Sequence, residues 1–213
     1  ALFNGFGGLA TFFIAWSEFN AIPDNVFQYV LIMLTTYIGG VTFSGSIIAY
    51  GKLSEKLKIQ KDSIITKLFT TLFYLSILFL VYSTALTSFI EIPIDFYKVL
   101  LILTLLGGIG FVLPIGGGDM PVVISLLNSF SGIAAAFAGL LLLNNVLIVA
   151  GSLVGASGLI LTVIMAKAMN RSIGNILFVG YASTSKSSGS QETGEVKPIN
   201  VSDAYLIVEN ATS

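Results

Sequence analysis

Cysteine and histidine are both absent from the 213 residues, and charged residues are scarce. Without thiolates and imidazoles, the chain has no means to form a disulfide scaffold, the usual zinc sites, or a triad with a histidine base. Charged residues make up 10% of the chain, against roughly 25% in an ordinary soluble domain. The ten Lys and Arg residues are too few and too scattered for a nucleic-acid groove, so no nucleic-acid partner is expected.

Apolar residues dominate instead, at 55% of the chain and a mean hydropathy of +0.93, which predicts an integral membrane protein. At about 20 residues per helical span, the length allows six or seven crossings and no sizeable soluble domain. Runs such as 100–111 are continuously apolar and lack the alternation of barrel strands, which favours helices. The predicted fold class is therefore all-α, a polytopic bundle of about six transmembrane helices.

Charges separate the apolar runs and so mark the expected spans: 1–17, 25–51, 68–90 and 99–118. The uncharged stretch 120–166 is too long for one helix, and Asn144 and Asn145 divide it into two. Bases gather on one side of this arrangement, at Lys52, Lys56, Lys58, Lys61, Lys67, Lys167 and Arg171, whereas the opposite connections carry Glu18, Asp24, Glu91 and Asp95 with the single base Lys98. The positive-inside rule then places both ends in the cytoplasm or mitochondrial matrix.

Composition changes near the end of the chain. Residues 1–175 form the predicted transmembrane domain, and 176–198 are rich in Ser, Gly, Thr and charge, which is typical of a flexible linker. Residues 199–213 are interpreted as the start of a truncated soluble domain, with a helix cap at Asn200, Ser202 or Asp203. The chain begins at Ala1 inside an apolar run without the basic segment of a signal peptide, so an excised fragment is expected.

Polar residues within the spans are informative because they are costly in lipid. Most hydroxyls are expected to hold helices together, at about 0.6 kcal/mol each, or to bond back to their own helix. Asn128 lies mid-span, where its own helix cannot satisfy its amide. Glycines accompany these polar groups in the first, second, fifth and sixth spans, which are expected to line a polar seam while the third faces lipid. The polar groups are Asn4, Thr42, Ser44, Ser46, Ser125, Asn128, Ser129, Ser131, Ser157 and Thr162.

The turn 114–121 has two interpretations. Asp119 and Pro121 suit the cap and first turn of the fifth helix, which needs no function. Alternatively, Asp119 faces Lys167 and Arg171 and acts as a switch that responds to a docked domain. No nucleotide phosphate loop of either common pattern is present.

Several segments, GGGDMPVV at 116–123, LNSFSG at 127–132, GASG at 155–158 and MAKAMNRS at 165–172, closely resemble the membrane domain of the beta subunit of proton-translocating NAD(P) transhydrogenase. VTFSGS at 41–46 and GKL at 51–53 support the likeness, which extends from Asn4 to about Arg171. The resemblance implies the C-terminal six helices of that domain, followed from Lys197 by the first residues of an NADP(H)-binding domain.

The resemblance also implies residue roles. A proton path would be lined by Ser46, Asn128 and Gly158, with Asn4 where many members carry a functional histidine. An amide does not titrate near neutral pH, whereas an imidazole does, so a histidine on a partner helix or a chain of held waters would have to replace it. The coupling surfaces toward the NADP(H) domain would hold the charged residues Asp119, Lys167 and Arg171.

By the same resemblance, the fragment alone is not catalytic and binds no cofactor or metal, because NADP(H) and NAD(H) bind to missing domains. Implied partners are the alpha subunit with its NAD(H) domain and helices, the rest of the beta subunit, a second protomer and the lipid of a bacterial or mitochondrial inner membrane. Two alternatives stay open. A small-solute secondary transporter would predict an inverted repeat, which the two halves do not show convincingly, and a membrane scaffold would not need Asn128.

Overall fold

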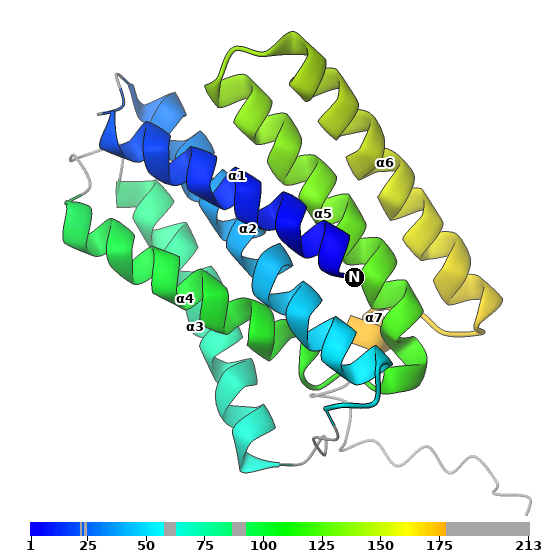
Figure 1. The fold of residues 1–213 in the computed structure, drawn as a ribbon. Coiled ribbons are helices and arrows are strands. Elements are labelled where there is room, and N and C mark those ends of the chain that lie inside the picture. The colour runs from blue at the N-terminus through cyan, green and yellow to red at the C-terminus, as the bar shows by residue number, and fades with distance from the viewer. Residues whose placement is uncertain (22, 24, 58–62, 87–92, 178–213) are drawn as a thin grey trace, which may run out of the picture. The chain divides into compact units, whose positions relative to one another are not determined.

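The computed structural model describes residues 1–177 apart from 22, 24, 58–62 and 87–92. These residues form helices and no strand, which confirms the all-α class (Figure 1). The predicted domain start at 199–213 and nearly all of the predicted linker lie outside the described residues, as do Asp24, Lys58, Lys61 and Glu91. The elements are α1 (Leu2–Asn20), α2 (Val26–Leu53), α3 (Ile64–Leu86), α4 (Ile94–Val112), the 3-10 turn η1 (Gly117–Asp119), α5 (Met120–Leu141), α6 (Asn145–Ala168) and α7 (Ile173–Leu177).

Five segments of the described chain are long and apolar enough to cross a membrane: α2, α3, α4, the η1–α5 unit and α6. Helix α1 is not among them, so length and apolarity give five candidate spans in the described residues, against about six expected. The predicted ends are less accurate than the spans. Asp95 and Lys98 form an ion pair at 2.9 Å inside the first turn of α4, so charges mark terminal turns rather than the loops beyond them. Helix α4 ends at Val112 because Pro114 follows.

The break between α5 and α6 lies at the predicted pair Asn144 and Asn145. Leu143 adopts a left-handed conformation (φ 52°), and the Asn144 N–H donates to the Gly139 carbonyl at 2.8 Å, which closes α5. The Asn144 side chain then accepts the Leu147 N–H at 3.1 Å and caps α6. One residue pair thus ends one helix and starts the next, and the two helices lie side by side as a hairpin (Figure 1).

Helix α2 is the most enclosed of the candidate spans, with 67% of its apolar stretch buried, because it contacts α1, α3, α4 and α5. Helix α3 packs on α4 and to a small extent on α2, and 17% of its stretch is buried. Its outward position agrees with the prediction, while its contact with lipid stays a prediction. Helix α6 is similarly exposed, at 22%, because it packs mainly on α5 through one strip of small residues.

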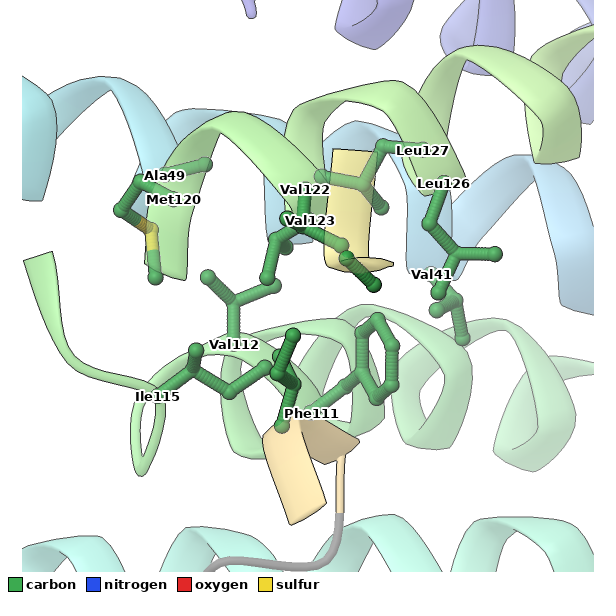
Figure 2. Close-up of a cluster of buried hydrophobic side chains, with 12 residues drawn as sticks. Val41, Ala49, Phe111, Val112, Ile115, Met120, Val122, Val123, Leu126 and Leu127 are labelled. Atoms are coloured by element: carbon green, nitrogen blue, oxygen red, sulfur yellow. The ribbon is translucent and has the colours of Figure 1, made fainter. Parts of the chain in front are cut away.

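A buried cluster fixes the connection from α4 to α5 (Figure 2). Its side chains come from α2, α4, α5, α6 and α7 and from the α4–α5 connection, and they enclose the end of the bundle at which α2, α4 and α6 finish. Ile176 of α7 is 1% exposed, so the first residues of the predicted linker belong to this packed unit. The cluster contains Val41, Ala49, Phe111, Val112, Ile115, Met120, Val122, Val123, Leu126, Leu127, Ala166 and Ile176.

Candidate functional site

A groove of about 490 Å³ brings together two of the predicted site residues, Asn4 and Asn128. Helix α5 supplies more of its lining than any other helix, α1 and α6 flank α5, and α2 contributes Leu53. The Asn4 Nδ2 donates to the Ile124 carbonyl of α5 at 3.1 Å. The groove is lined by Ala1, Asn4, Leu53, Pro121, Ile124, Ser125, Asn128, Leu161 and Met165.

Asn128 is half-buried in this groove, and its side-chain amide makes no hydrogen bond to any residue that the structure describes. This agrees with the prediction that its own helix cannot satisfy it. The amide therefore offers donors and an acceptor to whatever enters the groove. None of the side chains that line the groove titrates near neutral pH, so the described residues alone supply no proton acceptor there.

Ser46 lies outside the groove, at the contact between α1 and α2. Ser46 and Thr42 are both fully buried, and neither hydroxyl has a hydrogen-bond partner among the described residues. A Cβ placed on Gly5 would lie 3.1 Å from the Ser46 Cβ, and one on Gly8 would lie 2.9 Å from the Thr42 Cβ. The two glycines therefore let α1 close over hydroxyls that would each cost about 1–3 kcal/mol when left unsatisfied.

Gly158 lies at a third place, the seam between α5 and α6. A Cβ there would lie 2.9 Å from the N, Cα and Cβ of Ser129, so glycine is required for this approach. The Ser125 hydroxyl donates to the Gly158 carbonyl at 3.4 Å. The Thr162 hydroxyl lies 2.7 Å from the same carbonyl and 3.1 Å from the Ser125 hydroxyl. Because Ser125 also lines the groove, it connects the groove to the Gly158 seam.

The remaining hydroxyls divide between the two predicted uses. Ser44, Ser131 and Ser157 donate to carbonyls three or four residues earlier in their own helices. Ser157 is exposed and does not face α5. Ser129 instead donates across the seam to the Gly155 carbonyl at 2.6 Å.

Asp119 and Arg171, two of the three predicted coupling residues, form an ion pair in the structure. The Arg171 guanidinium lies 3.3 Å from an Asp119 carboxylate oxygen. The Asp119 side chain is 7% exposed and that of Arg171 is 52% exposed, so the carboxylate is the buried member. Asp119 occupies the N-cap position of α5, but its side chain makes no capping hydrogen bond, whereas Pro121 lies in the first turn as predicted.

The turn after α6 explains how Arg171 reaches this position. Asn170 adopts a left-handed conformation (φ 52°), the Asn170 N–H bonds to the Lys167 carbonyl at 2.9 Å, and the Arg171 N–H bonds to the Ala166 carbonyl at 2.9 Å. This Schellman arrangement turns the chain back at Arg171. Lys167 is exposed and forms no ion pair within the described part of the chain. It lines, with Arg171, a second cavity of about 480 Å³.

Sequence reasoning gave Lys52 no role beyond charge bias. In the structure its ammonium group lies among main-chain carbonyls at the end of α4, 3.5 Å from that of Val112 and 2.7 Å from that of Ile115, and it also donates to the Leu113 carbonyl. A lysine in the last turn of an apolar helix is a weak signal, because it does not reveal which carbonyls it meets.

Comparison with known proteins gives a consistent result. Residues 1–213 match the family described as NAD(P) transhydrogenase beta subunit. The NAD(P) transhydrogenase subunit beta of Rhodospirillum rubrum is 42% identical over an alignment of 183 residues, and the match covers 82% of this chain and 38% of that subunit. The same figures hold for the subunit from a specified strain of that bacterium. The chain thus spans 38% of the length of these relatives, and the comparisons give the transporter alternative no support.

Proposed function

Because the chain belongs to the NAD(P) transhydrogenase beta subunit family, we propose that it forms part of the membrane domain that moves protons while hydride passes between NAD(H) and NADP(H). Both nucleotides bind, in this proposal, to soluble domains outside the described residues. The observation that carries the proposal is the groove in which Asn4 and the unpartnered amide of Asn128 face one space.

The proton path is proposed to run through this groove and the two sites beside it. Ser125 links the groove to Gly158 and Thr162. Ser46 lies under Gly5, the residue that follows the groove residue Asn4, and Thr42 lies about one helical turn further along, under Gly8. Their unpartnered hydroxyls become water-holding positions when α1 shifts from α2 by a small amount, since a buried water needs two to four polar partners.

The titratable group is proposed to come from the alpha subunit. A helix of that subunit would lie in the groove and place an imidazole against Asn4 and Asn128, because the groove offers amides and a hydroxyl but no proton acceptor of its own. The amides would orient the imidazole and hold water beside it.

Coupling is proposed to occur at the end of the bundle that carries Asp119, Arg171 and Lys167. This end faces the NADP(H) domain in the cytoplasm or matrix, in keeping with the bases of the described loops. Helix α1 is proposed as the sixth span, because Gly5 and Gly8 at one end and Phe19 at the other keep it packed against the bundle along its length. The complete enzyme would be a dimer of protomers in a bacterial or mitochondrial inner membrane.

The test uses the complete complex in sealed vesicles, with NADPH-driven reduction of an NAD analogue and a dye that reports internal pH. Asn128→Leu is expected to abolish proton uptake tied to turnover while hydride exchange between soluble domains continues. Ser157→Ala is the matched control, because this exposed hydroxyl bonds only to its own helix. Undiminished pumping by the Asn128→Leu complex would refute the path.

A second variant separates function from stability. Ser46→Ala removes a hydroxyl that has no partner, so the folded complex is expected to be no less stable than the parent. Pumping is nevertheless expected to fall if Ser46 holds water on the path. A stable Ser46→Ala complex that pumps normally would place the path elsewhere.

A further inference from the structure

Lys52 caps a helix to which it does not belong. It lies in the last turn of α2, and its ammonium group contacts the carbonyls of Val112, Leu113 and Ile115 at the end of α4 and just beyond it. The last carbonyls of a helix lack intrahelical donors and carry partial negative charge, so a cation there is favourable. Pro114 provides no N–H to help satisfy them.

Burial makes this cap necessary. Val112, Leu113 and Ile115 are between 0% and 2% exposed. Carbonyls in such surroundings need a protein partner, and hydrogen bonds from a charged donor are roughly twice as strong as neutral ones. The Val112 carbonyl also accepts the Ile115 N–H at 3.1 Å, so within the described residues the carbonyls of Leu113 and Ile115 depend most on Lys52. The side chains of Val112 and Ile115 meanwhile lie in the cluster that also holds Ala49 of α2 (Figure 2). The start of the α4–α5 connection is therefore fixed to α2 by its side chains and by its main chain.

The clamped segment leads directly to the ion pair. Ile115 is four residues before Asp119, and Gly116, Gly117 and Gly118 fill the interval. A Cβ on Gly117 or Gly118 would meet nothing within 4 Å, so these glycines are not held by close packing. The position of Asp119 thus depends on two fixed ends, the start of α5 and the carbonyls bound by Lys52.

We propose that Lys52 is a positioning residue for the Asp119 turn and that it ties the turn to α2, the helix that carries Ser46 and Thr42. A displacement of α2 then carries the Lys52 ammonium group, the clamped carbonyls and the Asp119 end of the turn with it. The inference rests on the proposed coupling role of Asp119. It adds a physical connection between Asp119 and α2, the helix that carries the proposed proton-path residue Ser46.

A thiol probe tests the positioning itself. The chain contains no cysteine, and Ile115→Cys introduces one at a position that is 0% exposed and whose carbonyl is held by Lys52, in a full complex from which other reactive cysteines have been removed. Lys52→Gln is expected to raise the rate of maleimide labelling at this site at least about tenfold, because three buried carbonyls lose a charged donor. Lys56→Gln is the control, since the Lys56 ammonium group lies 5.9 Å over the Tyr50 ring on the same side of the bundle.

The role in coupling is tested by a double-mutant cycle on the rate of NADP(H) release. Lys52→Gln and Asp119→Asn are each expected to change this rate, and the double variant should change it no further, because both act through one turn. A lysine that serves only general stability would give independent effects that multiply. If Lys52→Gln prevents assembly, Lys52→Arg retains the charge, and its labelling rate is expected to stay within about twofold of the parent.

The outcomes separate the two proposals. Unchanged labelling of Ile115→Cys in the Lys52→Gln background would overturn the positioning role. So would labelling in the Lys52→Arg background that rises well beyond twofold. Independent effects in the cycle would overturn the connection to Asp119. If Asp119→Asn alone leaves NADP(H) release unchanged, the proposed coupling function fails, and the labelling rates still decide whether Lys52 positions the turn.

Discussion

Two facing glycines of the α5–α6 seam should respond very differently to the same substitution. A Cβ on Gly132 would lie 2.4 Å from the Gly155 nitrogen and 2.9 Å from both the Gly155 Cα and the Val154 carbonyl carbon. All three are main-chain atoms that cannot turn aside. A Cβ on Gly155 would meet the Ile133 Cγ1 at 2.9 Å, and its nearest main-chain neighbour, the Ile133 nitrogen, would lie at 3.3 Å, so the main-chain overlap is much smaller than at Gly132.

The magnitude follows from the separation required. Ordinary contact begins at 3.4 Å, so Gly132→Ala must move the two helices apart by roughly 1 Å at this point. Such overpacking typically costs about 1–3 kcal/mol, and lengthening the 2.6 Å bond from Ser129 to the Gly155 carbonyl adds about 0.6 kcal/mol. Both substitutions gain about 1 kcal/mol of helix propensity. Gly132→Ala should therefore lose roughly 0.6–2.6 kcal/mol, and Gly155→Ala should lie within about 1 kcal/mol of the parent.

The assay is the apparent Tm of each purified complex, followed by loss of the native peak in size-exclusion chromatography. The expected order is Gly155→Ala close to the parent and Gly132→Ala lower by several degrees, at about 2–4 °C per kcal/mol for a unit of this size. An equal or larger fall for Gly155→Ala would refute the reasoning, because the two sites share neighbours and propensity and differ in what the new Cβ meets.

Two further predictions concern polar pairs. The hydroxyls of Thr36 and Tyr97 lie 2.7 Å apart and are buried. Thr36→Val or Tyr97→Phe should each cost about 1–3 kcal/mol, because each leaves the other hydroxyl without its hydrogen-bond partner, and the double variant should cost less than the sum of the two. Additive losses in thermal unfolding would argue against the bond. Arg171→Gln leaves the buried Asp119 carboxylate without its partner and should lower stability by about 1–3 kcal/mol, discounted for the half-exposed guanidinium. Lys98→Gln breaks an exposed pair and should change stability by less than about 1 kcal/mol; equal losses in the two variants would contradict this assignment.

The sequence predicted the helices well and their ends poorly, for one physical reason. Apolar runs and the Asn144 break depend on local composition and capping, which the chain order contains. The start of α4 at Ile94 rather than 99 depends on whether Asp95 and Lys98 are tolerated near the helix start, where they pair with each other and where Asp95, in the first turn, interacts favourably with the helix dipole. Placing the span boundary after the charged residues therefore put the predicted start of α4 more than one helical turn too late.

The candidate site shows the same division between local and distant information. Asp119 and Arg171 were expected together because the fifth and sixth spans form a hairpin, which places the start of one beside the end of the other. The contacts of Lys52 were not predictable, because its partners are main-chain carbonyls more than sixty positions away that any residue type would supply. Likewise, composition did not distinguish Ser129, which bonds across the seam, from Ser131, which bonds to its own helix.

The polar seam expected between four helices is open in the described part of the chain, and a groove lies at the opening. Helices α1 and α6 lie on either side of α5, and the groove that contains Asn4 and Asn128 lies between α1 and α6. Buried amides in a membrane protein are costly unless another group satisfies them. The chain covers 38% of its relatives' length, and under the proposed function helices of the remaining subunits would fill this space. The unpartnered Asn128 amide therefore marks the surface at which a proton-carrying helix would have the most to gain.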